Sequence, residues 1–187
     1  MTESQDPAGV VEAQDVSKRA RSGQIDEDTF YADLPPELPA VDTETIRKTV
    51  AWMRSNYELV EFWRGKRKSG IVGNALTGTS HTGVPFRITQ EGKIEFSFGG
   101  WLKNTPPFTS IGRRRRLLKR LNTIKSISIR EAYISETRTV PISTIADDLS
   151  LMEFLRVFEW CLDEIKEAHE NNADEGDEDG GESCLLN

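Results

Sequence analysis

Two clusters of basic side chains are the groups in this sequence best suited to bind a ligand. The first follows the aromatic residue Phe62, and the second lies within the run SIGRRRRLLKRL. Their members are Arg64, Lys66, Arg67 and Lys68 in the first cluster, and Arg113, Arg114, Arg115, Arg116, Lys119 and Arg120 in the second. Guanidinium groups donate paired hydrogen bonds to phosphate, and the release of counterions adds salt-dependent free energy to such contacts. The clusters therefore predict contacts with the phosphates of DNA or RNA, and Trp63 beside the first cluster is a candidate to stack on a base.

Basic side chains at this density have two other interpretations. A run of charge is often a solvated surface with no binding role, and a basic surface attracts an acidic protein as well as a nucleic acid. The second hypothesis is therefore a protein-interaction subunit of a larger system, such as a nuclease or a toxin. It predicts that the isolated chain ignores nucleic acid at moderate salt and co-purifies with an acidic protein.

Side chains that could catalyse a reaction are few. His81 and His169 are the two histidines, and no CxxC or HxxxH spacing is present to hold zinc. A magnesium-dependent nuclease needs clustered carboxylates, yet no Asp occurs between Thr45 and Asp147. We therefore expect a non-catalytic chain without a metal or a cofactor. A nuclease-like enzyme is the third hypothesis, and it requires a cleft in which Glu58, Glu61, Glu91 or Glu95 converge.

The net charge of −7 conceals three segments of different sign. Residues 1–42 hold 3 basic and 10 acidic side chains, residues 43–166 hold 21 and 13, and residues 167–187 hold none and 8. Segments that are acidic and poor in apolar residues cannot bury enough surface to fold alone. We therefore expect a disordered acidic segment over 1–42, a basic domain over 43–166 and a disordered acidic tail over 167–187. The tails are candidates to dock on the basic surface and to suppress weak binding.

The spacing of apolar residues predicts the helices and strands. Ile46, Val50, Met53 and Tyr57 recur at intervals of three and four, which is typical of an amphipathic helix. Alternation, turn residues and capping residues predict the other elements. The expected elements are helices over 43–61 and 110–121 and a helix capped by Ser150 with Glu153, strands at 71–76, 84–88 and 94–98, and short strands at 126–134 and 140–142. The stretch FWRGKRKSG is expected to be a polar loop.

These elements predict an α+β fold, in which a small antiparallel sheet carries helices on one face as a two-layer sandwich flanked by disordered tails. Cys161 and Cys184 are expected to be free thiols. No apolar run is long enough to cross a bilayer and no secretory signal opens the chain, so we expect a cytoplasmic protein without membrane contacts. The oligomeric state is left open.

The region from Trp52 to about Ile165 resembles an uncharacterised bacterial accessory domain. Four stretches carry the resemblance: FWRGKRKSG, EFSFGGWLKNTPPF, the RLN of RRRRLLKRLNTI, and VPISTIADDLSLMEFLRVFEWCLDEI. The resemblance is to the C-terminal part of longer proteins of unknown activity, which can carry nuclease-like portions upstream. The matching residues are turn glycines, loop prolines and core aromatics, so the resemblance supports the fold and implies no catalytic residue.

Overall fold

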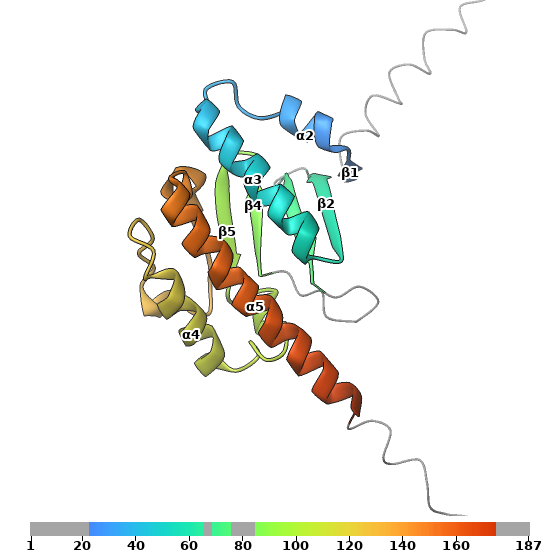
Figure 1. Cartoon of the computed structure of the whole chain (residues 1–187), viewed down its shortest axis with the longest axis vertical. Coiled ribbons are helices and arrows are strands. Elements are labelled where there is room, and N and C mark those ends of the chain that lie inside the picture. The colour runs from blue at the N-terminus through green and yellow to red at the C-terminus, as the bar shows by residue number, and fades with distance from the viewer. Residues whose placement is uncertain (1–22, 66–68, 76–84, 175–187) are drawn as a thin grey trace, which may run out of the picture.

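A six-stranded antiparallel sheet with two long helices on one face forms the body of the protein (Figure 1). The computed structural model describes residues 23–65, 69–75 and 85–174. The strands lie in the sheet in their sequence order, so that each strand pairs with the next one along the chain. Helices α3 (Ala40–Asn56) and α5 (Asp148–Asp174) lie on the same side of this sheet. The expected α+β architecture, with helices on one face of an antiparallel sheet, is confirmed.

The remaining elements are shorter and connect these layers. They are β1 (Gly23–Ile25), α2 (Glu27–Ala32), β2 (Leu59–Arg64), β3 (Gly70–Asn74), β4 (Phe86–Thr89), β5 (Lys93–Ser97), the 3-10 helix η1 (Leu102–Asn104), α4 (Ile111–Leu121), the 3-10 helix η2 (Glu131–Tyr133), β6 (Thr137–Pro141) and the 3-10 helix η3 (Ile142–Ile145). No helix in the described ranges has the length and apolar character needed to cross a bilayer.

The β4–β5 hairpin lies in the sheet between β3 and β6, and it follows its sequence pattern closely. Gly92 in the turn has φ +68°, a conformation that glycine adopts without steric cost. The register sets Phe86 opposite Phe96 and Ile88 opposite Ile94. All four side chains are buried, so the hairpin presents one apolar face to the helices.

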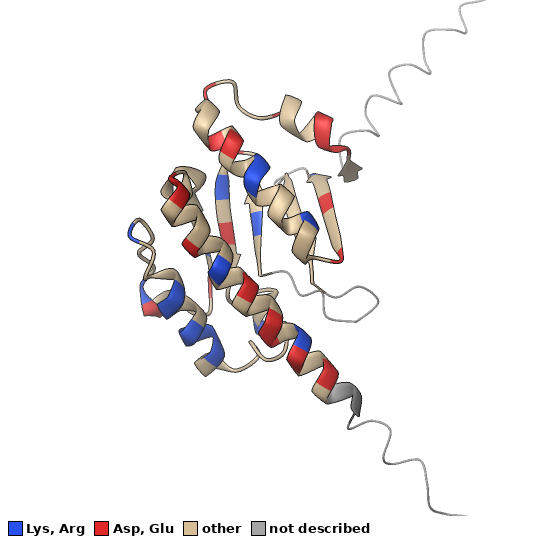
Figure 2. Cartoon of the chain, in the orientation of Figure 1, with Lys and Arg blue, Asp and Glu red and all other residues tan. Residues whose placement is uncertain are grey.

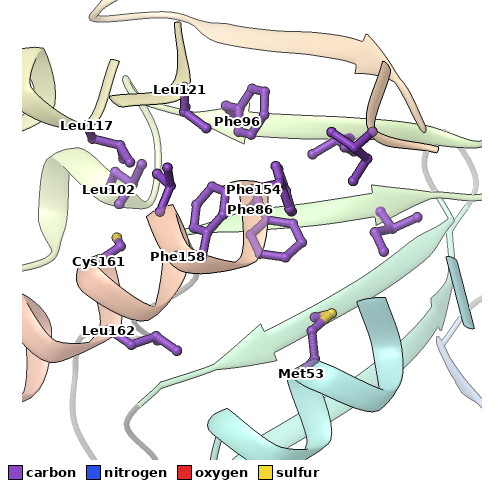
Figure 3. Close-up of a cluster of buried hydrophobic side chains, with 14 of the residues drawn as sticks. Met53, Phe86, Phe96, Leu102, Leu117, Leu121, Phe154, Phe158, Cys161 and Leu162 are labelled. Carbon is purple, nitrogen blue, oxygen red and sulfur yellow. The ribbon is translucent and has the colours of Figure 1, made fainter. Parts of the chain in front are cut away.

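Helix α5 closes the core over this hairpin (Figure 3). The Phe158 ring lies 4.4 Å from the Phe86 ring and 6.1 Å from the Phe96 ring, measured between centroids. Phe154 lies 4.8 Å from Phe158 on the same helix. Leu117 of α4 reaches the same cluster, together with Leu102 and Leu121 (Figure 3). Helix α4 is therefore held to the domain by its own apolar face.

The folded part begins before residue 43, so the expectation of disorder over 1–42 is wrong for residues 23–42. Strand β1 pairs with β2, and α2 begins after Asp26, whose carboxylate accepts a hydrogen bond from the Thr29 amide at 2.7 Å. Phe30 is fully buried, 5.7 Å from the ring of Phe62. One aromatic anchor and a capped helical turn thus order a segment whose composition suggests disorder.

Three further expectations about local structure are wrong. The helix expected over 43–61 spans Ala40–Asn56, and residues 59–61 belong to β2. The stretch FWRGKRKSG, expected as a loop, begins with the last residues of β2, because Phe62 packs inward against Phe30. Residues 126–134, expected as a strand, form a loop and η2. There the Asn122 side chain bonds both the amide and the carbonyl of Ile129, which are the groups that a strand would use for pairing.

Helix α5 differs from expectation at both of its ends. The Asp147 carboxylate accepts the Ser150 amide at 2.9 Å, so Asp147 caps the helix in place of Ser150. Hydrogen bonds from Ser150 hold the pKa of Asp147 below its ordinary value. At the other end the helix continues to Asp174, so the expectation of disorder over 167–187 is wrong for residues 167–174.

Candidate nucleic-acid interface

Helix α4 is amphipathic, and its two sides are sharply different in composition. Leu117, Leu118 and Leu121 are buried against the rest of the domain. The opposite side is exposed and carries Arg115, Arg116, Lys119 and Arg120. Lys and Arg positions recur along α4 and in the loop that follows it (Figure 2). The expected helix over 110–121 is therefore present, with most of its basic residues on the outside.

Arg114 is the exception, because it lies on the buried side of α4 with only 6% of its surface exposed. One of its terminal nitrogens donates to the carbonyl oxygens of Phe108 at 2.9 Å and Thr109 at 3.1 Å. These bonds satisfy two carbonyls in the turn that leads into the helix. The prediction that Arg114 contacts a ligand is therefore corrected: its guanidinium faces the protein.

We expect Arg114→Ala to destabilise the fold by about 2 kcal/mol, because it removes the donor to two carbonyls and some buried packing. Arg116→Ala, two residues away on the exposed side, should change stability by less than about 0.5 kcal/mol. Urea unfolding of both variants measures the difference. Equal stability of the two variants would contradict the structural role of Arg114.

Two more arginines of α4 are held by α5. Arg113 forms an ion pair with Glu164, which also accepts the indole N–H of Trp160 at 3.0 Å. The guanidinium of Arg120 lies over the Trp160 ring, 4.3 Å from its centroid. Arg113 is neutralised inside this network, whereas Arg120 is stacked and still exposed. A guanidinium that lies over an aromatic ring can still donate N–H hydrogen bonds to a phosphate.

Arg115 pairs with Glu131 of η2 at 2.7 Å, with 56% and 65% of the two side chains exposed. An ion pair at this exposure contributes little to stability, so a phosphate can replace the carboxylate at small cost. The pair borders a cleft of about 330 Å³ between α4 and the following loop. Leu118, Lys119 and Asn122 complete its lining.

Arg116 and Lys119 differ from the other basic residues of the helix. Both are exposed, and within the described ranges neither forms an ion pair or lies over an aromatic ring, as Arg120 does. They lie three residues apart, so their side chains emerge about one helical turn from each other on the same side. These two side chains are therefore available to an anionic ligand.

The loop after α4 adds two cations that sequence reasoning missed. The Asn122 side chain accepts the Ile129 amide and donates to the Ile129 carbonyl, both at 2.8 Å, and so folds the loop back on the helix. Lys125 and Arg130 of this loop are exposed and have no ion pair among the described residues. The signal was the composition of NTIKSISIR, but only the closed loop places these residues beside α4. We call the basic face the set Arg115, Arg116, Lys119, Arg120, Lys125 and Arg130.

The first predicted cluster lies elsewhere. Arg64 ends β2 and forms an ion pair with Asp33, with 29% and 31% of the two side chains exposed. Trp63 precedes it on β2 and is 44% exposed. Lys66, Arg67 and Lys68 lie outside the described residues. The end of β2 and helix α4 are on opposite sides of the molecule (Figure 1), so the structure does not bring Trp63 and Arg64 to the basic face.

The carboxylates considered for catalysis do not converge. Glu95 is buried and pairs with Arg87 of the neighbouring strand β4 at 2.8 Å. Glu61 accepts a bond from Asn74 at 3.3 Å, and strands β3 and β4 lie between Glu61 and Glu95. In the part of the chain that the structure describes, no three His, Cys, Asp or Glu residues gather to hold a metal.

Cys161 is buried in the core, and burial raises the pKa of its thiol well above the ordinary value. A thiol held neutral is a poor nucleophile. His81 and Cys184 lie outside the described residues. The basic face is thus the best-supported site in the described ranges. Searches against protein-family models, curated proteins and solved structures found no match to this chain.

Proposed function

We propose that this chain binds nucleic acid through its phosphates, using the basic face of α4 and the loop that follows. The observation that carries the proposal is a set of four exposed side chains without ion pairs among the described residues. They are Arg116, Lys119, Lys125 and Arg130. Such groups break no ion pair when a phosphate replaces the water around them, and each contact releases counterions from the polyanion. The proposed role is binding without catalysis.

The scarcity of exposed apolar side chains favours a nucleic acid over an acidic protein. Protein–protein interfaces contain an apolar core inside a polar rim. On α4 the only large apolar side chain that is exposed is Ile111, at its first position. The other exposed large apolar residues lie on other elements or loops: Val41, Leu59, Trp63, Trp101, Leu149 and Met152. The basic face therefore suits a partner that binds through negative charge and has no apolar surface to bury.

Fluorescence anisotropy with the full chain and a labelled duplex of about twenty base pairs tests this proposal. We expect binding whose log K falls linearly with log salt, with a slope of about −3 to −5 for four or five phosphate contacts. Polyglutamate of similar length is the matched competitor, because it carries charge without phosphate. Absence of binding at about 0.05 M salt, or equal competition by polyglutamate, would rule the proposal out.

The acidic residues after α5 provide a second test. Residues 175–187 hold five acidic side chains and no basic one, and a tethered polyanion competes with a free ligand at high effective concentration. Deleting 175–187, which leaves α5 intact, should tighten binding several-fold and make the salt dependence steeper. Replacing the five acidic residues by Gln or Asn should do the same. If neither change alters affinity, the acidic segment does not compete for the basic face.

A further inference from the structure

The positions of the aromatic side chains bear on which form of nucleic acid the basic face accepts. Every Phe, Trp and Tyr of the chain lies within the described residues. Only two of them, Trp63 and Trp101, are exposed, at 44% and 37%. Proteins that bind single strands stack successive bases on exposed aromatic rings, and each stacked base adds substantially to affinity. The location of these two rings therefore decides whether the bases of a single strand could stack on an exposed aromatic ring at the basic face.

Neither exposed ring belongs to the basic face. Trp63 lies on β2, opposite Gln24 of the edge strand β1. Trp101 precedes η1, and its ring lies beside Arg87 of β4, whose guanidinium is 5.9 Å from the ring centroid. Both side chains are thus associated with the sheet, not with the exposed side of α4.

An aromatic ring that borders the basic face is already occupied by one of its arginines. Trp160 of α5 carries the Arg120 guanidinium over its ring at 4.3 Å. The Phe108 ring packs edge-on against the Trp160 ring, with 6.0 Å between the centroids. The indole N–H of Trp160 donates to Glu164. A base could stack there only by displacing Arg120, which would remove a cation from the site. Trp160 therefore positions a phosphate-binding group and offers no platform to a base.

The backbone that carries the cations is held in place. Arg116, Lys119 and Arg120 stand on one helix, and Asn122 holds the loop that supplies Lys125 and Arg130. Cations on a fixed backbone suit a rigid ligand, because a flexible strand would lose conformational entropy on binding without stacking to offset the loss. A double helix also presents its phosphates at higher density than a single strand.

We infer that the ligand of the basic face is a double helix, bound through its phosphate backbone without contacts to the bases. This inference rests on the proposed function. Backbone contacts alone carry no sequence information, so binding should be largely independent of base sequence. Duplex DNA and duplex RNA share this chemistry, and the experiment below separates them.

The test is a competition experiment with the full chain and a labelled DNA duplex at about 0.1 M salt. The competitors are the unlabelled duplex, each of its single strands, and an RNA duplex of the same length. For four contacts, slopes of about 0.9 and 0.7 per phosphate lead us to expect duplexes to compete about sixfold or more better than single strands. Preference for DNA or RNA among the duplexes identifies the source of the phosphates.

Two aromatic variants make the result specific. Trp63→Leu and Trp101→Leu should leave binding to every competitor unchanged, because neither ring takes part. Single strands that compete as well as the duplex, or a loss of affinity in either variant, would overturn the inference and leave the proposed function standing. Absence of binding to all four nucleic acids would overturn both.

Discussion

Replacing Arg116, Lys119, Lys125 and Arg130 together by Gln should weaken binding to a duplex by about a thousandfold at 0.1 M salt. Each side chain is exposed and without an ion pair among the described residues, so each can neutralise one phosphate. A phosphate contact contributes about 0.9 to the slope of log K against log salt, and the slope should therefore fall by about 3.6. Anisotropy titrations at several salt concentrations measure the affinity and the slope together.

A variant with the same net charge separates local contacts from general attraction. Four basic residues on other elements are changed to Gln: Lys48 of α3, Lys93 of β5, and Arg156 and Lys166 of α5. All four are exposed. This variant should lose much less affinity, because long-range attraction is screened within about 10 Å at this salt concentration. Equal losses in the two variants would show that net charge, and not the basic face, controls binding.

Phe158→Ala should lower the free energy of unfolding by about 3–5 kcal/mol. Phe158 is fully buried and contacts the rings of Phe86, Phe96 and Phe154. Its removal leaves a cavity where α5 meets the β4–β5 hairpin, and it loosens the helix against which α4 packs. Urea unfolding followed by circular dichroism gives the change, which is a large fraction of the stability of a domain of this size.

Met152→Ala on the same helix is the matched control. Met152 is 41% exposed, so its truncation should cost less than about 1 kcal/mol. A loss below about 1 kcal/mol for Phe158→Ala would mean that α5 does not close the core as described.

The local sequence pattern was sufficient to predict the elements in which one spacing of apolar residues continues along the whole element. The β4–β5 hairpin follows strict alternation around a turn glycine, and α4 and the body of α5 follow helical spacing. The prediction of a polar loop at the first cluster was wrong because residues 62–64 belong to strand β2. Phe62 is recognisable as a core residue only when Phe30, distant in the sequence, packs on it. Long-range pairs of this kind leave no local trace.

In the candidate site, too, some features follow from the local sequence and others depend on packing. The basic run of α4 was evident from composition, but the face that each arginine occupies depends on the packing of the helix. Arg114 turns inward because two carbonyls of the preceding turn need a donor. Lys125 and Arg130 join the site because Asn122 folds the loop back, an interaction between a side chain and backbone that spacing rules do not register.

A map of the residues that a duplex contacts tests most directly whether the basic face binds nucleic acid. Backbone amide signals of the full chain are followed by NMR during titration with a DNA duplex at low salt. We expect the shifts to concentrate on residues 115–131, while the signals of Trp63 and Arg64 at the end of β2 remain unchanged. Shifts centred on the end of β2, or spread evenly over the molecule, would contradict binding at the basic face.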